Sequence, residues 1–128
     1  MTIAVVTGAS SGMGKEFVLQ LSDYVQVDEI WVIARREGAL EELKSKVKTP
    51  LRVISLDLCD PQSFDVYKEI LAQEQPDVKL LVNAAGFGKF GDFKDIPLKE
   101  QMNMIDLNCK ALMSITYITL DYMKEGSR

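Results

Sequence analysis

Short apolar runs alternate along this chain with longer segments in which apolar residues recur at helical spacing. The short runs are rich in β-branched residues and leucine, which is typical of strands buried on both faces of a parallel sheet. They comprise Ile3–Thr7, Ile30–Ala34, Leu51–Leu56 and Lys79–Asn83. The helical patterns comprise Lys15–Ser22, Leu40–Val47, a segment from Asp60-Pro61 to Gln75-Pro76, and a long segment from Leu98 to Lys124.

This order of elements predicts an α/β fold with an open, doubly wound parallel sheet, because crossovers between parallel strands are right-handed and carry helices. Asp60 and Pro61 are typical of a helix N-cap and a first helical turn, respectively. A glycine-rich loop, Gly86–Gly91, separates the fourth strand from the long helix. No linker or repeat interrupts the series, so residues 1–128 are expected to form a single domain.

Composition and charge narrow the classes of function. Of the 128 residues, 47% are hydrophobic and 27% are charged, which is ordinary for a soluble domain with a buried core. The net charge is −4 and there is no long basic run, so we do not expect nucleic acid as a partner. No segment is apolar enough to cross a membrane, and the N-terminus lacks the features of a signal peptide. These observations favour a cytoplasmic location.

The side chain that most commonly ligates metals in proteins is absent. The sequence contains no histidine, so no imidazole can ligate a metal or act as a base, and no metal site is expected. The two cysteines, Cys59 and Cys109, lie far apart in the sequence. A disulfide framework is therefore not expected, in keeping with a reducing compartment.

The segment Thr7–Gly14, TGASSGMG, joins the first strand to the first helix. Ligands of open parallel sheets bind beyond the carboxyl ends of the strands, which is where this segment lies. Gly8 permits a tight turn, while Gly12 and Gly14 let a pyrophosphate and the neighbouring strand approach without a Cβ atom in the way. Free N–H groups and the positive end of the helix dipole would then face the anion.

Further details of this loop favour a dinucleotide. The hydroxyls of Ser10 and Ser11 add donors. The spacing Gly-x-x-x-Gly-x-Gly differs from the common Gly-x-Gly-x-x-Gly fingerprint, and Lys15 is not followed by Ser or Thr as in a P-loop. An ATP site is therefore not expected, and the remaining alternative is a glycine-rich turn without a ligand.

The end of the second strand bears on the choice between NADP and NAD. An NAD site usually has an acidic residue there, which accepts a hydrogen bond from the ribose 2′-hydroxyl. This chain instead has Arg35 and Arg36, whose guanidinium groups match the 2′-phosphate of NADP. Glu37 is the NAD alternative, and the two arginines could also simply cap a solvated loop.

Four motifs together resemble the short-chain dehydrogenase/reductase family: TGASSGMG at Thr7–Gly14, Asp57-Leu58, NAAG at Asn83–Gly86, and NCKALMS at Asn108–Ser114. They occur in the order and at the spacing of that family. The resemblance implies a Rossmann-type sheet, here about four strands in the order 3-2-1-4. It also implies that Asp57 contacts the adenine amino group and that Leu58 lies along the adenine ring. Asn108 matches the asparagine of the family's catalytic tetrad.

The resemblance further implies that Asn83–Gly86 support the central strand and the cofactor's ribose. The full set of expected cofactor-binding residues is Gly8, Ser10, Ser11, Gly12, Met13, Gly14, Arg35, Arg36, Asp57, Leu58, Asn83, Ala84, Ala85 and Gly86.

The other members of the family's tetrad, a serine and a Tyr-x-x-x-Lys pair, have no match here. The residues four positions after the four tyrosines are Asp28, Leu71, Asp121 and Gly126. We therefore expect a truncated chain, the NADP(H)-binding, N-terminal part of an oxidoreductase for a carbonyl or hydroxyl substrate, which is inactive alone. The alternative is a stand-alone dinucleotide-binding or interaction module without catalysis.

Apolar surface also predicts a homodimer or larger assembly. The fourth strand should form an edge of the sheet that only Lys79 guards, and unguarded edges pair readily with other chains. The long helix is apolar on two sides, which indicates two partners. One expected stripe comprises Met104, Ala111, Ile115, Ile118 and Tyr122, and the other comprises Cys109, Leu112, Leu120 and Met123.

Overall fold

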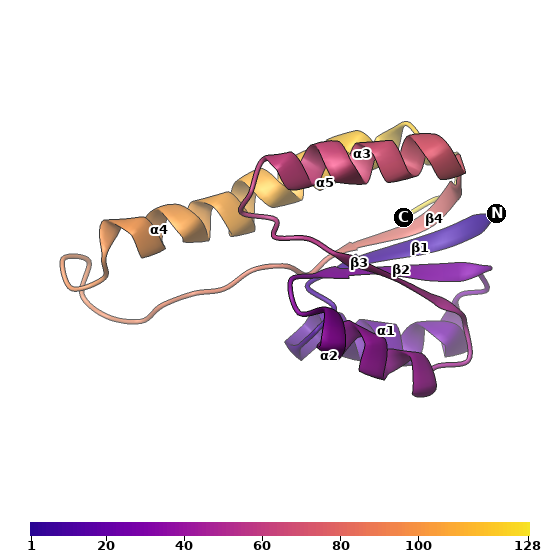
Figure 1. Ribbon diagram of the computed structural model, residues 1–128, viewed down its shortest axis with the longest axis horizontal. Coiled ribbons are helices and arrows are strands. Elements are labelled where there is room, and N and C mark those ends of the chain that lie inside the picture. Colours follow the sequence, from indigo (N-terminus) through magenta and orange to yellow (C-terminus); the bar gives the residue numbers. More distant parts are fainter.

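A four-stranded parallel sheet forms the centre of the molecule in the computed structural model, which describes residues 1–128 (Figure 1). The strands are β1 (Thr2–Thr7), β2 (Glu29–Ala34), β3 (Leu51–Ser55) and β4 (Asp77–Asn83). Their order is β3-β2-β1-β4, and all three neighbouring pairs are parallel. The predicted strand order 3-2-1-4 is confirmed.

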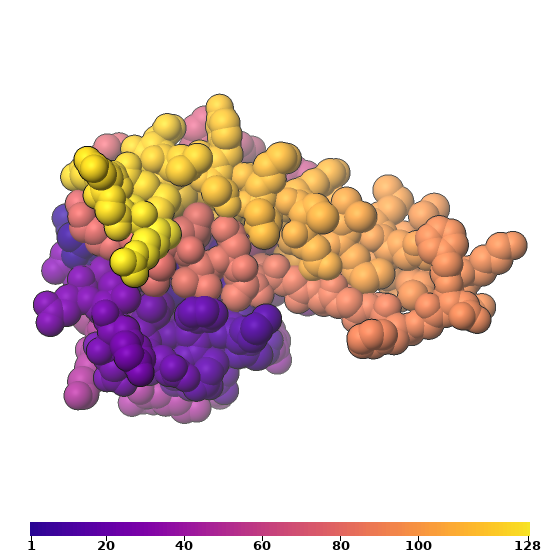
Figure 2. All heavy atoms as spheres, turned by 180° about the vertical axis from the view of Figure 1, so that it is seen from behind, coloured from indigo at the N-terminus to yellow at the C-terminus, as the bar shows by residue number.

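Helices cover both faces of this sheet. Helices α1 (Gly12–Tyr24) and α2 (Glu37–Glu41) lie on one face, and α3 (Gln62–Glu74) and α5 (Leu112–Leu120) lie on the other (Figure 1). Helix α4 (Leu98–Ile105) precedes α5, and together with the loop before it α4 projects away from the body of the molecule (Figures 1 and 2).

The core consists of two apolar layers, because alternate residues of a strand point to opposite faces of the sheet. On the α3 and α5 side, Ile3 and Val5 pack with Trp31 and Ile33. On the α1 and α2 side, the intervening residues of the same strands pack against the helices, among them Val6. Both faces of β1 and β2 are therefore buried, as their continuous apolar runs predicted.

The second helical segment begins and ends earlier than its predicted range of Leu40–Val47. Helix α2 starts at Glu37 and continues into the 3₁₀ helix η1 (Glu42–Ser45). Leu40 and Leu43 are both fully buried. Leu40 lies on α2 and Leu43 on η1, and residues three apart share a face in either kind of helix, so both leucines face the core.

Helix α3 begins at Gln62, one residue after Pro61, which the sequence analysis placed in the first helical turn. The Asp60 carboxylate accepts a hydrogen bond from the Gln62 N–H at 3.0 Å. Its backbone carbonyl accepts another from the Ser63 N–H at 3.0 Å. Asp60 thus satisfies two N–H groups that have no partner inside the helix.

The long helical segment is neither regular nor as long as predicted. A π-helical turn, η2 (Asp106–Ala111), separates α4 from α5, and α5 ends at Leu120 rather than near Lys124. Ala111 and Ile115 are buried as expected, whereas Met123 packs against the core instead of joining the outer stripe. The cause is that the chain turns back toward the sheet after Leu120.

This returning segment also covers part of the outer edge of β4. The N–H of Val78 donates to the carbonyl of Tyr122 at 2.9 Å, and the N–H of Leu81 donates to the carbonyl of Arg128 at 2.8 Å. The N–H of Arg128 in turn donates to the carbonyl of Lys79 at 3.0 Å. The prediction that Lys79 alone guards this edge is wrong, because three backbone hydrogen bonds already occupy it.

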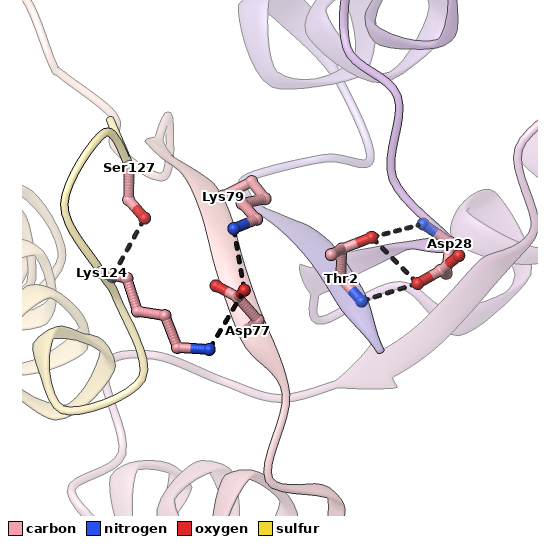
Figure 3. A network of polar contacts seen from close by, with 6 residues as sticks. All are labelled: Thr2, Asp28, Asp77, Lys79, Lys124 and Ser127. Carbon is pink, nitrogen blue, oxygen red and sulfur yellow. Dashed lines mark hydrogen bonds and ion pairs between the residues drawn. The ribbon is translucent and has the colours of Figure 1, made fainter.

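Ion pairs anchor the same segment at the amino ends of the strands (Figure 3). The Asp77 carboxylate lies 2.8 Å from the Lys79 ammonium and 3.3 Å from that of Lys124. The hydrogen bond from Lys79, with help from Lys124, holds the pKa of Asp77 below its ordinary value. On the neighbouring strand, hydrogen bonds from Thr2 likewise lower the pKa of Asp28.

A buried hydrogen bond links the two helices on one face of the sheet. The hydroxyls of Tyr67 on α3 and Thr119 on α5 lie 2.9 Å apart, and both residues are fully buried. Because the Thr119 hydroxyl donates to the Ile115 carbonyl at 2.6 Å, the Tyr67 hydroxyl is the donor between them. Burial raises the pKa of Tyr67 to about 12.

This link predicts how a Tyr67→Phe variant depends on pH. Near neutral pH the variant loses one hydrogen bond, so its free energy of unfolding should fall by about 1 kcal/mol. Unfolded tyrosine ionises near about pH 10, whereas native Tyr67 stays protonated to about 12. The native protein should therefore lose stability as the pH rises from about 10 to 12, and the variant should lack this particular loss.

Urea unfolding at about pH 8 and about pH 11, followed by the fluorescence of the single tryptophan, the buried Trp31, measures the difference. A stability gap between the two proteins that is the same at both pH values would contradict the prediction.

Candidate functional site

A cleft of about 750 Å³ opens at the carboxyl ends of the strands. It is lined by the loops that follow β1, β2, β3 and β4, and by one face of α4. Of the fourteen residues predicted to bind a cofactor, all but Gly14 and Asn83 line this cleft. The fold therefore brings together four separate sequence motifs around one cavity.

The glycine loop after β1 needs its glycines for two different reasons. Gly8 and Gly12 have φ angles of +63° and +55°, in the left-handed region that favours glycine. A Cβ atom on Gly8 would lie 2.6 Å from the carbonyl oxygen of Ala84, and one on Gly14 would collide with the carbonyl oxygen of Gly8. Gly14 thus permits close packing beneath the cleft, whereas Gly12 faces open space.

Helix α1 begins at this loop with its positive end free. Its N-cap residue, Ser11, makes no capping hydrogen bond through its side chain, and the first turn contains no acidic residue. Because the N–H groups of a first helical turn have no partner inside the helix, this end can bind an anion. The hydroxyls of Ser10 and Ser11 lie beside it on the cleft wall.

Thr7 holds the ends of β1 and β4 together, a role that the sequence analysis missed. Its buried hydroxyl accepts hydrogen bonds from the N–H groups of Ala84 and Ala85, both at 3.1 Å. These bonds fix the turn after β4 against the glycine loop. The available signal was a hydroxyl residue at the end of a buried strand, directly before the first glycine.

The end of β2 carries two unpaired positive charges. Arg35 and Arg36 are exposed, line the cleft and form no ion pair within the chain. The hydroxyl of Ser55 on β3 donates to the Arg35 carbonyl at 2.9 Å and so fixes the backbone at this point. Glu37 lies in the first turn of α2, outside the cleft lining.

The turn after β3 presents a carboxylate to the cleft. Asp57 accepts a hydrogen bond from the Cys59 N–H through Oδ1 at 3.0 Å, and its carbonyl accepts one from the Ser63 hydroxyl at 2.6 Å. Leu58 is buried beside it. Burial, reinforced by the nearby Asp57 charge, raises the pKa of the Cys59 thiol, which is therefore not an activated nucleophile.

Neither predicted asparagine lines the cleft. The amide of Asn83 donates to the Thr116 hydroxyl at 2.9 Å and so ties β4 to α5. Asn108 lies on the π-helical turn, where its side chain accepts from the Phe87 N–H at 2.9 Å and donates to the Phe87 carbonyl at 2.8 Å. Asn83 thus fixes the end of β4 and Asn108 fixes the loop that follows it. π-Helical turns frequently occur at functional sites.

Helix α4 contributes a wall that the sequence analysis did not anticipate. Its cleft-lining residues are Glu100 and Asn103, and Leu107 in the following turn η2 also lines the cleft. The three are spaced by three and four, which places them on one side of this helical segment. This spacing was visible in the sequence, but nothing there showed that the face would turn toward the cleft.

Two further observations concern the molecule as a whole. No group of three or more histidine, cysteine, aspartate or glutamate side chains is arranged to hold a metal ion. None of the helices combines the length and the apolar character that crossing a membrane requires.

Comparison with known proteins places the chain among the short-chain dehydrogenases. The family model described as short chain dehydrogenase matches residues 2–128. An uncharacterized oxidoreductase from Staphylococcus epidermidis is 30% identical over 125 residues, which cover 98% of this chain and 54% of the relative. The NADP-dependent 3-hydroxy acid dehydrogenase from Schizosaccharomyces pombe is 31% identical over 121 residues, which cover 91% of this chain and 46% of the relative.

A solved structure shows the same arrangement. The alcohol dehydrogenase from the archaeon Thermococcus sibiricus, complexed with 5-hydroxy-NADP, has a TM-score of 0.80 and 25% sequence identity, with 95% of this chain and 53% of that chain covered. The chain therefore spans about half the length of the proteins it matches. Since the family model extends over nearly all of its residues, the chain belongs to the short-chain dehydrogenase/reductase family of oxidoreductases.

Proposed function

We propose that this chain binds NADP(H) and forms the dinucleotide-binding part of an oxidoreductase that acts on a carbonyl or hydroxyl group. The observation that carries the proposal is that a free helix N-terminus and two unpaired arginines line the same cleft. NADP has anionic groups at two points, its pyrophosphate and its 2′-phosphate. The cleft offers positive potential at two corresponding points.

The residues of the cleft fit this cofactor group by group. The N–H groups at the start of α1, with the hydroxyls of Ser10 and Ser11, suit the pyrophosphate. Asp57 and Leu58 supply an acceptor and an apolar surface for adenine. When bound, the cofactor supplies or accepts a hydride at its nicotinamide ring. The residues of this chain bind and orient it.

Two observations favour NADP over NAD. Arg35 and Arg36 are free to bind a phosphate, because no carboxylate of the chain pairs with them. Glu37, the residue that could accept from a ribose hydroxyl, lies outside the cleft lining. The names of the Schizosaccharomyces pombe relative and the Thermococcus sibiricus structure mention NADP or a derivative, which also supports this choice.

We also propose a cytoplasmic location, in keeping with two free cysteines and the absence of any disulfide.

Replacing Arg35 and Arg36 together with alanine tests the cofactor preference. Each charge-assisted hydrogen bond to a phosphate contributes about 1.5–3 kcal/mol, so the original chain should bind NADP⁺ more tightly than NAD⁺ by at least about tenfold. The double variant should bind the two nucleotides equally. Calorimetric titration measures both affinities.

A charge-matched control replaces Lys46 and Lys48, which are exposed and lie outside the cleft, with alanine. This control should keep the preference for NADP⁺. Equal affinities of the original chain for NADP⁺ and NAD⁺ would overturn the choice of cofactor.

The isolated chain should bind cofactor without turning over substrate. Its 128 residues contain no Tyr-x-x-x-Lys pair, and an unassisted phenol with a pKa near about 10 is a poor base at neutral pH. NADPH oxidation with a panel of ketones, followed by absorbance, should therefore not exceed the rate without protein. Substrate-dependent turnover that persists through repeated purification would contradict this expectation, whereas binding without turnover also fits a non-catalytic dinucleotide-binding module.

We further propose that the chain forms a homodimer or larger assembly through the outer face of its last helices. This outer face comprises Met102, Ile105, Leu112, Met113, Tyr117 and Leu120, each between 47% and 77% exposed. A large apolar side chain gains about 1.5–3 kcal/mol when it leaves water, so several together favour association. The edge of β4 is a weaker candidate, because backbone hydrogen bonds already occupy part of it.

A Tyr117→Glu variant tests this surface, since it places a charge at the most exposed residue of the outer face. Light scattering at micromolar concentrations should give a multiple of the monomer mass for the original chain and a lower mass for the variant. Tyr24→Glu is the matched control, because Tyr24 is 82% exposed on α1, and it should leave the mass unchanged. A monodisperse monomer of the original chain would disprove the proposed assembly.

A further inference from the structure

The wall that α4 adds to the cleft carries one polar side chain without a partner. Of its two cleft-lining residues, Glu100 forms an ion pair with Lys89 at 3.3 Å, and Leu107, which continues this wall in η2, is apolar. The side chain of Asn103 is half-buried and makes no hydrogen bond within the chain. An amide that is partly removed from water benefits from a partner, so a ligand in the cleft is the natural candidate.

Asn103 stands beside the turn that holds Asp57. The Cys59 thiol lies 3.9 Å from the Asn103 carbonyl oxygen, so α4 and the turn after β3 are in contact at this point. The N–H of Cys59 lies 3.0 Å from Oδ1 of Asp57. Asn103 and Asp57 therefore line the same end of the cleft, although they are 46 positions apart in the sequence.

The two side chains have complementary hydrogen-bonding capacities. An ionised Asp57 carboxylate can only accept, and the Cys59 N–H already uses one of its oxygens. Adenine presents an amino donor next to ring nitrogens that only accept, so a carboxylate alone cannot satisfy its polar edge. An asparagine amide both donates and accepts, and it pairs with adenine through two hydrogen bonds in other settings.

The Cys59 thiol in this turn is only a weak donor and already faces the Asn103 carbonyl, and the other donor side chains of the cleft lie elsewhere. Ser10 and Ser11 belong to the glycine loop, and Arg35 and Arg36 follow β2. The side-chain amide of Asn103 is the donor that stands next to the Asp57 turn.

We propose that Asn103 positions the adenine base of the bound dinucleotide and helps to select adenine over hypoxanthine. The proposal rests on the dinucleotide-binding function proposed above and assigns to α4 a part in recognising the cofactor. Hypoxanthine is the discriminating probe, because it differs from adenine in having an oxygen in place of the amino group and a protonated ring nitrogen beside it.

The test compares NADP⁺ with its hypoxanthine analogue by calorimetric titration of the original chain and of Asn103→Ala. The original chain should prefer NADP⁺. Loss of the amide should weaken NADP⁺ binding by about 3- to 10-fold, the effect of one ordinary hydrogen bond or slightly more, and should weaken the analogue less. Asn103→Gln, which keeps the amide, should recover part of the preference.

Lys99→Ala is the matched control, because Lys99 is exposed on the same helix and does not line the cleft. It should change neither affinity, and thermal unfolding of each variant checks that the fold is retained. An equal loss of affinity for both nucleotides in Asn103→Ala would indicate a merely structural effect and would overturn the proposal. Unchanged NADP⁺ binding in that variant would overturn this inference alone, whereas no binding of either nucleotide by the original chain would overturn the proposed function as well.

Discussion

The close contact between the carboxyl ends of β1 and β4 is the constraint on which the rest of the site depends. At this point Thr7 accepts two backbone hydrogen bonds from Ala84 and Ala85, and Gly8 has no room for a Cβ atom against Ala84. Two strands that are adjacent in the sheet but about 75 residues apart in sequence thus end at the same level. The contact packs the glycine loop directly against the turn after β4, and Gly12 and Met13 at the start of α1 line the cleft above it.

The same contact fixes the first residues of the loop after β4, where the chain leaves the sheet. Beyond Ala85 the chain is exposed, and its next fixed point is Phe87, whose N–H and carbonyl both bond to Asn108. Gly86 lies between these two anchors, and a Cβ atom there would come within 2.8 Å of the Asn108 side chain. The π-helical turn that carries Asn108 also joins α4 to α5. The glycine loop, the turn after β4 and the wall formed by α4 are therefore one connected assembly.

Local patterns sufficed to predict the strands and the position of the glycine loop, whereas the strand order and the other parts of the cleft were implied by the family resemblance. Continuous apolar runs such as Ile30–Ala34 are distinctive because both faces of such strands are buried. A glycine-rich turn directly after such a run is typical of a ligand site at the carboxyl end of a parallel strand. The errors fall where distant residues decide the structure. The end of α5 at Leu120 depends on Tyr122 and Arg128 pairing with β4, and no local signal encodes that pairing. The part played by α4 was missed for the same reason, because its cleft-lining face is determined by the π-helical turn and by the anchoring of the loop before it.

Side-chain hydrogen bonds distinguish two groups of polar residues at this site: those bonded within the chain, which stabilise the fold, and those without a partner, which can bind a ligand. The family resemblance implies a cofactor-binding role for Asn83 and a catalytic role for Asn108, yet their amides are occupied by Thr116 and by the Phe87 backbone. The groups that are not occupied, namely the guanidinium groups of Arg35 and Arg36, the hydroxyl of Ser11 and the amide of Asn103, are those that line the cleft. Polar groups that are already satisfied stabilise the fold and gain little from a ligand, whereas groups held in place without a partner gain a hydrogen bond when one binds. Asn83 and Asn108 therefore support the structure around the cleft, and less conspicuous side chains that line it have no partner within the chain.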